Sequence, residues 1–331
     1  MTDAPVITTI RHRTGVIELN RPKALNSLNP EMIELITQAL QAWRDDDAVE
    51  QVLVMTTNPK AFCAGGDVRA ARDGILAGRP EDVDHFFAQE YDLNALIATY
   101  PKPYIAVIDG VAMGGGLGIS AHGSHRIVTS RAFESMPEMA IGYVTDVGIA
   151  YMSQRVMSPA LAKFWAVTGY RMYAPDLLYT GLATGFVEDP AAYIEAVIEK
   201  GIENVPQRTD VPGPAPLEEF AEDIEAAFVP GATWDEILAA CSPRLRGLVE
   251  ELTMAASPLA IEAALQLFDY EEQCATIGEA LAAEKRLGAY MVRQPDFAEG
   301  VRAVLVDKTK DATFAPAEDI DRDAIHAALV G

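Results

Sequence analysis

Two glycine clusters, each placed shortly after an apolar run, constrain this chain more than any other feature of its sequence. A glycine pair at 65–66 follows the run 52–55, and a glycine triplet at 114–116 follows the run 104–108. Glycine has no Cβ, so a backbone of glycines can approach a ligand closely. A helix start leaves amide groups without intrahelical acceptors, and these carry partial positive charge. Two such loops can direct two amides at one oxygen, which predicts an oxyanion hole and acyl chemistry.

Apolar runs and helical patterns alternate along the first half of the chain. The runs predict strands at residues 6–10, 16–19, 52–55, 104–108 and 125–129. Apolar residues at helical spacing predict helices over 30–43, with Asn29 as the N-cap, and over 81–99 and 117–122. Strands that alternate with helices indicate an α/β fold with functional loops at the strand ends.

The second half of the chain is dominated by amphipathic helical patterns. They predict helices over residues 160–167, 175–179, 191–200, 216–227, 234–241, 244–254, 258–270 and 277–292. Residues 207–216 contain three prolines and one glycine, which indicates a loop or linker. We therefore expect an α/β core over residues 1–190, which carries the active site, and a helical C-terminal region over residues 191–331 that packs on it.

The charge balance restricts the partners that this chain can have. Its 26 basic and 49 acidic residues give a net charge of −23, which argues against nucleic acid and anionic membranes. An anionic ligand would need a local basic patch, although for any single basic residue solvated surface is the favoured interpretation. The candidates near the first glycine cluster are Arg11, Arg13, Arg21, Lys23, Lys60 and Arg69.

Cysteine usage and the N-terminal sequence bear on the compartment. Cys63, Cys241 and Cys274 are too few and too scattered for a disulfide framework, which fits a reducing environment. Residues 1–5 show no basic or apolar leader pattern, and no apolar run reaches the ~20 residues that a bilayer requires. We therefore expect a soluble cytoplasmic protein with no membrane partner.

Several common catalytic and cofactor motifs are not completed. Ile119 stands where a dinucleotide fingerprint needs its third glycine, and Ser120 lacks the second glycine of a nucleophile elbow. His122 and His125 have no nearby carboxylate or cysteine to complete a metal site. Cys63 has apolar neighbours and no histidine nearby in the sequence, which favours a packed residue over a nucleophile. We therefore expect no metal site and no redox cofactor.

Two carboxylates follow the second glycine cluster. Glu138 lies in apolar sequence about twenty residues after it, and Asp146 lies eight residues further on. Burial among apolar neighbours would raise the pKa of the Glu138 carboxyl toward neutrality and suit it to proton transfer. A carboxylate at either position can also cap the start of a helix. On the residues alone, catalysis and capping both stay open for each of them.

Four segments resemble the crotonase (enoyl-CoA hydratase/isomerase) superfamily in order and spacing: residues 21–26, 61–67, 109–118 and 136–138. Within the superfamily the chain is most similar to the 3-hydroxyisobutyryl-CoA hydrolase family. That similarity lies in the first glycine loop, the Asp-Val-Gly element at 146–148 and the segment 296–308. The resemblance covers nearly the whole chain. It implies a crotonase-type core of repeated ββα units in a superhelix, with a helical C-terminal region.

The resemblance also implies catalytic roles. The amides of Gly66 and Gly115 would polarise a thioester carbonyl, and Glu138 and Asp146 would be the catalytic carboxylates. Hydratases of the superfamily have a further glutamate where this chain has Gly118, so water addition by two glutamates is not expected.

Substrate-binding positions follow from the same resemblance. Glu90 falls where the hydrolase family has a substrate-binding glutamate, and Asp67 closes the first glycine loop. Residues around Ala24 and Ala64 would line the adenine pocket. Coenzyme A would enter as part of an acyl-CoA substrate, and no separate cofactor is implied. The superfamily often forms trimers, so a homo-oligomer is also implied.

One segment departs from the hydrolase pattern. Tyr143 and Thr145 replace residues that are commonly apolar or proline, and they add hydroxyl groups to the pocket wall. The resemblance therefore implies hydrolysis of a short 3-hydroxyacyl-CoA, with 3-hydroxyisobutyryl-CoA from valine breakdown as the expected substrate and an acyl preference that can differ. Two alternatives stay open: hydration or isomerisation of an enoyl-CoA, and a non-catalytic protein that binds acyl-CoA.

Overall fold

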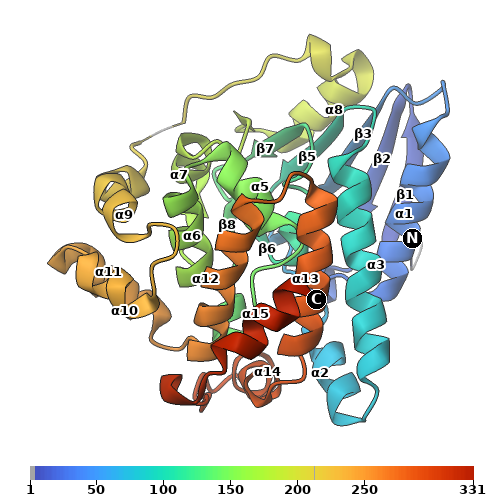
Figure 1. The fold of residues 1–331 in the computed structure, drawn as a ribbon. Helices are drawn as coiled ribbons and strands as arrows, with labels where there is room; N and C mark the ends of the chain where they lie inside the picture. Colours follow the sequence, from blue (N-terminus) through green and yellow to red (C-terminus); the bar gives the residue numbers. More distant parts are fainter. Residues whose placement is uncertain (1–3, 212) are drawn as a thin grey trace. The chain divides into compact units, whose positions relative to one another are not determined.

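The computed structural model describes residues 4–211 and 213–331 (Figure 1). Residues 1–3, where the leader prediction begins, and residue 212, in the predicted loop, lie outside the described residues. The chain divides into two units built from interleaved segments. Unit 1 comprises residues 1–66, 92–134 and 172–216, and unit 2 comprises residues 67–91, 135–171 and 217–331. The predicted boundary at residue 190 stays a prediction.

Unit 1 contains a six-stranded sheet. Its strands in spatial order are β1 (Val6–Arg11), β2 (Thr14–Leu19), β3 (Gln51–Thr56), β5 (Tyr104–Ile108), β7 (His125–Val128) and β10 (Gly185–Phe186). β1 pairs antiparallel with β2, and every other neighbouring pair is parallel. The five strands expected from the sequence are confirmed, as is the α/β class. β10, with two residues, is too short to leave a periodic signal.

Helices of unit 1 cover this sheet because its strands are apolar. Inward residues from β2, β3, β5 and β7 form one buried cluster with the apolar side of α8 (Pro190–Lys200). The helix α1 (Pro30–Arg44) begins as predicted, since the Asn29 side chain accepts from the amide of Met32 at 2.9 Å. Shorter helices of the unit are η1 (Pro22–Ala24), α7 (Ala174–Tyr179) and η3 (Ile202–Asn204).

A second, four-stranded sheet also belongs largely to unit 1. Its spatial order is β4 (Ala61–Cys63), β6 (Val111–Met113), β8 (Phe133–Ser135) and β9 (Met172–Tyr173). Strands of two or three residues cannot establish an alternating pattern, so sequence analysis missed this sheet. The helix expected over 117–122 is wrong in its bounds, because α4 spans Gly115–Gly118. Beyond Gly118 the amides of Ser120 and Gly123 bond carbonyls three residues back, which makes turns instead of helix.

Unit 2 is helical, and α3 (Pro80–Ala98) runs from it into unit 1. Its other helical elements are α2 (Val68–Leu76), η2 (Glu138–Ile141), α5 (Ile149–Val156), α6 (Pro159–Thr168), η4 (Pro216–Phe220), α9 (Ala221–Ala227), α10 (Trp234–Ala240), α11 (Pro243–Thr253), α12 (Pro258–Glu272), α13 (Ile277–Met291), α14 (Pro295–Val301), a π-turn (Arg302–Val306), η6 (Ala317–Asp319) and α15 (Arg322–Val330). The predicted helices of this region are confirmed, with small shifts at their ends.

A repeated capping signal explains where these helices begin. Ser158, Ser242 and Ser257 each accept a hydrogen bond from an amide in the first turn of α6, α11 and α12, and each is followed by proline. Serine satisfies an amide that the helix leaves unpaired, and proline needs no such partner. None of the helices in residues 4–211 and 213–331 combines the length and apolar character needed to cross a bilayer.

Candidate active site

The two glycine clusters lie at the ends of two paired strands in unit 1. β4 and β6 run parallel, with Ala61 opposite Val111 and Cys63 opposite Ala112. Because parallel strands present their carboxyl ends at one edge, the loops that follow them leave the sheet side by side. The triplet thus follows β6, and not β5 directly as the sequence suggested. The structure brings the two predicted loops together.

Close backbone contact between these loops explains the glycines. A Cβ on Gly116 would lie only 2.3 Å from the carbonyl oxygen of Cys63, so no larger residue fits there without movement of the backbone. A Cβ on Gly65 would lie 3.3 Å from the carbonyl oxygen of Met113 and 3.9 Å from the amide nitrogen of Gly115. The Cys63 thiol is buried and donates to the carbonyl of Gly65 at 3.8 Å, as expected for a packed residue.

The amides of Gly66 and Gly115 remain without backbone acceptors. Gly115 is the first residue of α4, so its amide has no carbonyl one turn earlier in the helix. In the described part of the chain, neither amide donates a hydrogen bond to another backbone group. Both are therefore available to an external oxygen, and their joint action on one oxygen stays a prediction.

The loop that carries Ala24 lies against the first glycine cluster. The amide of Ala64 donates to the carbonyl of Leu25 at 3.1 Å, and the amide of Leu28 donates to the carbonyl of Gly65 at 2.8 Å. The two residues expected at the adenine pocket therefore lie in adjacent loops of unit 1. Contact with adenine stays a prediction.

Asn26 ties these loops together, a role that sequence analysis missed. Its side chain is fully buried, accepts from the amide of Arg21 at 2.9 Å and donates to the carbonyl of Phe62 at 2.9 Å. Its φ of +57° is a left-handed conformation that asparagine tolerates better than most residues. Its partners lie on both sides of it in the sequence, so the local pattern carried no signal for this role.

Unit 2 holds the three predicted carboxylates in a buried group. Glu90, Glu138 and Asp146 are 1%, 7% and 4% exposed. Burial raises the pKa of Glu138 well above its usual range, and the charge of Asp146 raises it further. Burial raises the pKa of Asp146 to about 7, and burial with the Asp146 charge raises that of Glu90 to about 8. The pKa values of Asp146 and Glu90 thus lie near neutral pH, which suits acid–base chemistry.

A chain of hydroxyl groups reaches Asp146. Tyr91 donates from its hydroxyl to Oδ2 of Asp146 at 2.7 Å, and the hydroxyls of Tyr91 and Tyr143 lie 3.1 Å apart. The Tyr143 ring stacks on Phe87 with centroids 5.3 Å apart. Since Tyr91 uses its proton on Asp146, Tyr143 is the donor between the two tyrosines. Sequence analysis noted the Tyr143 hydroxyl. It missed that the Tyr91 hydroxyl lies between Tyr143 and the Asp146 carboxylate and bonds both.

Three buried polar atoms in this group have no protein partner. They are Glu90 Oε1, Glu138 Oε2 and Thr145 Oγ1, and none makes a hydrogen bond within the described residues. Buried polar atoms of folded proteins are nearly always satisfied, so unsatisfied ones call for an explanation. A polar ligand or water that occupies the site would satisfy them.

The capping explanations for the two acids are wrong. Gly148 is the N-cap of α5, and the Asp146 side chain accepts from Tyr91 instead. Pro137 is the N-cap of η2, with no side-chain cap, and Glu138 is the first residue of that helix. By contrast, Asp67 does cap a helix, because its carboxylate accepts from the amide of Ala70 at the start of α2. Its contact with substrate stays a prediction.

Comparison with known proteins identifies the family of this chain. The sequence profile of the enoyl-CoA hydratase/isomerase family matches residues 14–329, nearly the whole chain. The chain belongs to the enoyl-CoA hydratase/isomerase family. The resemblance expected from the sequence is therefore confirmed.

Curated relatives within the family carry one recurring name. The mitochondrial 3-hydroxyisobutyryl-CoA hydrolase of Xenopus tropicalis is 37% identical over 333 residues, which cover 95% of this chain and 85% of the relative. The protein of the same name from Homo sapiens is 35% identical over 321 residues, which cover 92% of this chain and 82% of the relative.

Solved structures of the family carry other names. A carnitinyl-CoA dehydratase from Mycobacterium thermoresistibile has a TM-score of 0.91 and 30% identity, with coverage of 99% of this chain and 96% of that one. An enoyl-CoA hydratase from Rhodobacter sphaeroides 2.4.1 has a TM-score of 0.90 and 32% identity, with coverage of 98% and 97%. The crotonase-type fold with its helical C-terminal region is confirmed by both.

Basic residues near the first loop differ in their availability to an anionic ligand of this family. Arg11 pairs with Glu195, and Arg13 pairs with Glu50. Lys23 is exposed in η1, next to the Ala24 loop, and makes no ion pair within the described residues. We expect the paired arginines to bind phosphate less readily than Lys23, because the carboxylates already neutralise them.

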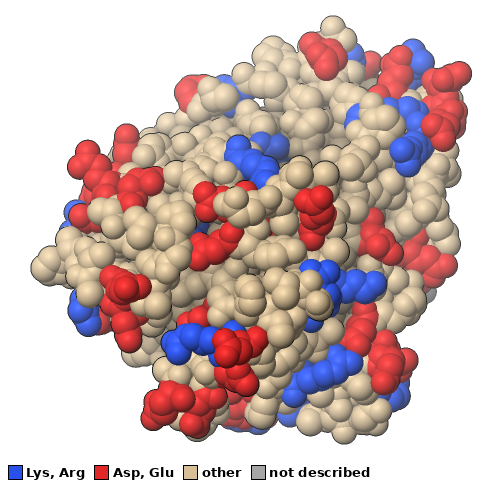
Figure 2. Space-filling model, viewed as in Figure 1, with Lys and Arg blue, Asp and Glu red and all other residues tan. Residues whose placement is uncertain are grey.

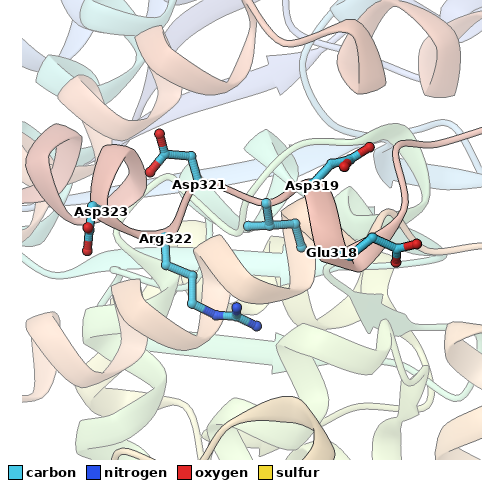
Figure 3. Close-up of a pocket in the computed structure, with 6 residues that line it drawn as sticks. Glu318, Asp319, Asp321, Arg322 and Asp323 are labelled. Atoms are coloured by element: carbon cyan, nitrogen blue, oxygen red, sulfur yellow. The ribbon is translucent and has the colours of Figure 1, made fainter.

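Charged groups and a hollow also lie outside this site. On the face drawn in Figure 2, acidic and basic side chains form small groups within a larger uncharged area. A hollow in the C-terminal segment (Figure 3) is lined by Glu318, Asp319, Ile320, Asp321, Arg322 and Asp323. In residues 4–211 and 213–331, no group of three or more histidine, cysteine or acidic side chains is arranged to hold a metal ion.

Proposed function

We propose that this chain is an acyl-CoA thioester hydrolase that converts 3-hydroxyisobutyryl-CoA and water into 3-hydroxyisobutyrate and coenzyme A, a step of valine breakdown. The observation that carries the proposal is the buried acid pair Glu138 and Asp146, together with Gly118 at the position of the second hydratase glutamate. Curated relatives that share 35–37% of their residues with nearly the whole chain bear this activity in their names.

The proposed chemistry begins at the thioester carbonyl. Gly66 and Gly115 would donate their amides to the carbonyl oxygen and stabilise the negative charge that develops in the tetrahedral intermediate. Their lack of backbone acceptors among the described residues supports this role. An amide pair of this kind contributes on the order of 10²–10³ in rate per donor.

Glu138 would carry the proton or the acyl group. In one route it removes a proton from water, the hydroxide adds to the carbonyl, and the proton passes to the departing CoA thiolate. In the other it attacks the carbonyl itself, expels the thiolate, and forms a mixed anhydride that water then cleaves. Hydroxylamine added during turnover would trap the anhydride as a hydroxamate, and its absence would favour the first route.

Asp146 and Glu90 would bind the acyl chain of the substrate and the water that attacks it. Asp146 either orients the attacking water or accepts from the substrate 3-hydroxyl, and Glu90 Oε1 is a second unpaired acceptor nearby in the buried group. A site built to bond a hydroxyl disfavours a chain without one, because its polar atoms would then stay unpaired. We propose that Ala24, Ala64 and Asp67 contact the coenzyme A portion of the substrate.

Thiol release over a panel of acyl-CoA esters tests the function. We expect 3-hydroxyisobutyryl-CoA to release thiol about 5- to 150-fold faster, by kcat/KM, than isobutyryl-CoA, because one unpaired buried group costs about 1–3 kcal/mol. A panel without thiol release from any 3-hydroxy ester would contradict the proposal. Tight binding of esters without thiol release would instead favour a non-catalytic acyl-CoA-binding protein.

One rival reaction is supported by a specific observation. The solved relatives named as a dehydratase and a hydratase share 30% and 32% of their residues with this chain. Incubation with crotonyl-CoA, followed by absorbance of the conjugated thioester, measures hydration directly. We expect no loss of that absorbance, since Gly118 cannot supply a second carboxylate.

Coenzyme A is proposed here as part of the substrate, and neither a metal nor a redox cofactor is proposed. A homotrimer stays a prediction from family resemblance, and light scattering of the purified chain would test it. The cytoplasmic location also stays a prediction, because the curated relatives are named as mitochondrial proteins.

A further inference from the structure

The turn that carries Asp146 has an unfavourable backbone. Val147 and Gly148 have φ values of +56° and +74°, so two consecutive residues are left-handed. Glycine adopts this conformation freely, but a β-branched valine is strained in it. Such a turn persists only where neighbouring groups hold it. The structure therefore has to supply contacts that fix this segment of unit 2.

Glu284 supplies the main contact. It lies on α13, 136 residues further along the chain, and its side chain is fully buried. Both of its carboxyl oxygens accept from the amide of Gly148, at 3.0 and 2.9 Å. Gly148 is the N-cap of α5 and has no capping side chain of its own. A distant acid thus bonds the amide of the N-cap residue, as the N3 glutamate of a capping box would do locally.

A second buried acid, Glu271 on α12, lies next to Glu284. It is fully buried and interacts with the carboxyl of Glu284. The titratable and charged groups that face this pair are Asp146, Arg155, Tyr91, Tyr143 and Cys274. Burial raises the pKa of Glu271 to about 8 and that of Glu284 well above its usual range. Two adjacent buried acids cannot both be charged, so the pair retains at least one proton at neutral pH.

We propose that Glu284 is a positioning residue for Asp146. By accepting from the Gly148 amide it fixes the left-handed turn at 147–148 and thereby the direction of the Asp146 carboxylate, whose Oδ2 meets the Tyr91 hydroxyl. Glu284 does not touch the reacting atoms. The inference rests on the proposed hydrolase function, since it assigns a residue to that same site.

The proposal predicts an effect on kcat with little effect on KM. Asp146 acts on the acyl end of the substrate, whereas most of the binding surface of an acyl-CoA belongs to its coenzyme A portion. Loss of the Glu284 acceptor leaves the Gly148 amide buried without a partner. A displacement of about 1 Å at a catalytic group can cost ~10²-fold in rate. We therefore expect kcat to fall about 10- to 100-fold in a variant without this acceptor.

Three substitutions of Glu284 separate the hydrogen bond from the charge. Glu284→Gln keeps an acceptor at the same reach and resembles the protonated acid, so kcat should stay within about 3-fold of wild type. Glu284→Asp keeps a carboxyl but places it farther from the Gly148 amide, because its side chain is one methylene shorter. Glu284→Ala removes the acceptor. Both should therefore lower kcat about 10- to 100-fold. KM should change less than about 3-fold in all of them. Initial rates of thiol release and circular dichroism of the full chain supply the measurements.

A matched control removes a largely buried acid of unit 2 that lies outside this arrangement. Glu262 on α12 is 8% exposed and bonds Gln266 and Arg322. Glu262→Gln should leave both kcat and KM within about 2-fold of wild type. A fall in kcat equal to that of Glu284→Ala would indicate general destabilisation and overturn the positioning role.

Two further outcomes would also overturn the proposal. One is full kcat in folded Glu284→Ala. The other is full kcat in Glu284→Asp with loss in Glu284→Gln, which would make charge the decisive property. If Glu284→Ala does not fold, the comparison of Gln with Asp still decides between hydrogen bond and charge. If the wild-type chain releases no thiol, the proposed function fails. That result differs from a failure of this inference, which requires an active wild-type chain.

Discussion

At the scale of single residues, Glu138 and Asp146 share burial but differ in their partners. Asp146 accepts from the Tyr91 hydroxyl, which lowers its pKa against the effect of burial, so that it stands at about 7. Glu138 has an unpaired Oε2, and its pKa is raised well above the usual range. Environments that separate the pKa values of two acids are typical of sites in which the two acids have different roles.

Glu138→Gln tests the proton-carrying role. We expect kcat for 3-hydroxyisobutyryl-CoA to fall at least ~10³-fold, because an amide can neither take a proton from water nor attack the thioester. Binding of the ester, measured by calorimetry, should persist. Glu134→Gln is the matched control, since Glu134 is a buried acid of unit 1 to which we assign no role in catalysis. Near wild-type turnover in Glu138→Gln would remove this acid from the mechanism.

Tyr91→Phe tests the hydroxyl that bonds Asp146. The Tyr91 hydrogen bond lowers the pKa of Asp146, so its loss should raise that pKa above about 7. A hydrogen bond to a charged group contributes about 1.5–3 kcal/mol, which corresponds to a rise of roughly one to two pH units in the acidic limb of kcat/KM. Tyr151→Phe removes a hydroxyl that bonds only the carbonyl of Ala275 and should leave the profile unchanged. An unshifted profile in Tyr91→Phe would mean that Asp146 does not control that limb.

At the scale of elements, α13 serves the site from one face. Glu284 and Gly288 are four residues apart on this helix and therefore project to the same side. Glu284 holds the amide of Gly148, while Gly288 leaves room for Tyr143. One helix thus supports both the backbone of the Asp146 turn and the hydroxyl chain that reaches its carboxylate.

Gly288→Ala should disturb this support, because a Cβ at position 288 would lie 2.4 Å from the Tyr143 hydroxyl oxygen. Overpacking of this kind costs about 1–3 kcal/mol of unfolding free energy. Tyr143→Phe removes the clashing oxygen and leaves the nearest ring carbon at 3.4 Å, so Gly288→Ala should cost much less in that background. Urea denaturation of the four proteins in a double-mutant cycle measures the coupling. Additive effects would show that the two positions do not share this space.

At the scale of the whole molecule, several buried acids couple stability to pH. Burial raises the pKa of Glu90, Glu134 and Glu271 to about 8 each, and that of Asp146 to about 7. In the unfolded chain these groups titrate near ~4. Between those values the folded chain binds more protons than the unfolded one, so unfolding free energy falls as pH rises.

We expect the unfolding free energy to be at least about 2 kcal/mol lower at roughly pH 8.5 than at roughly pH 5.5. The net charge of −23 acts in the same direction, because its self-repulsion grows as further carboxyls ionise. Urea denaturation at the two pH values gives the difference directly. Glu134→Gln should reduce it, since an amide does not titrate. Equal or greater stability at the higher pH would mean that these acids are charged in the folded chain.

Local patterns in the sequence were enough to predict most of the fold and part of the candidate site. The strands of the six-stranded sheet and the long helices have enough residues for a period to emerge, and the serine and asparagine caps mark their starts. Strands of two or three residues, such as β6 and β9, are too short for that, so the second sheet was missed. The proposed catalytic acids were predicted from motif resemblance.

Contacts between distant segments were the part that sequence reasoning could not reach. Glu284 meets Gly148 across 136 residues, and Tyr91 meets Asp146 across 55 residues. Neither contact leaves a trace in the local pattern of hydrophobic and polar residues, because it depends on how the helices pack. The same holds for Asn26, whose partners Arg21 and Phe62 lie on opposite sides of it in the sequence.

The paired glycine loops have a consequence for how such a chain can diversify. Two main-chain amides are encoded by no particular side chain, so substitutions elsewhere in the pocket leave them in place. Their only local vulnerability is bulk, as the 2.3 Å approach of a Cβ at Gly116 to the Cys63 carbonyl illustrates. A lineage could therefore exchange its acids and pocket walls, and with them its chemistry, around the proposed anion receptor, which point mutation rarely reaches.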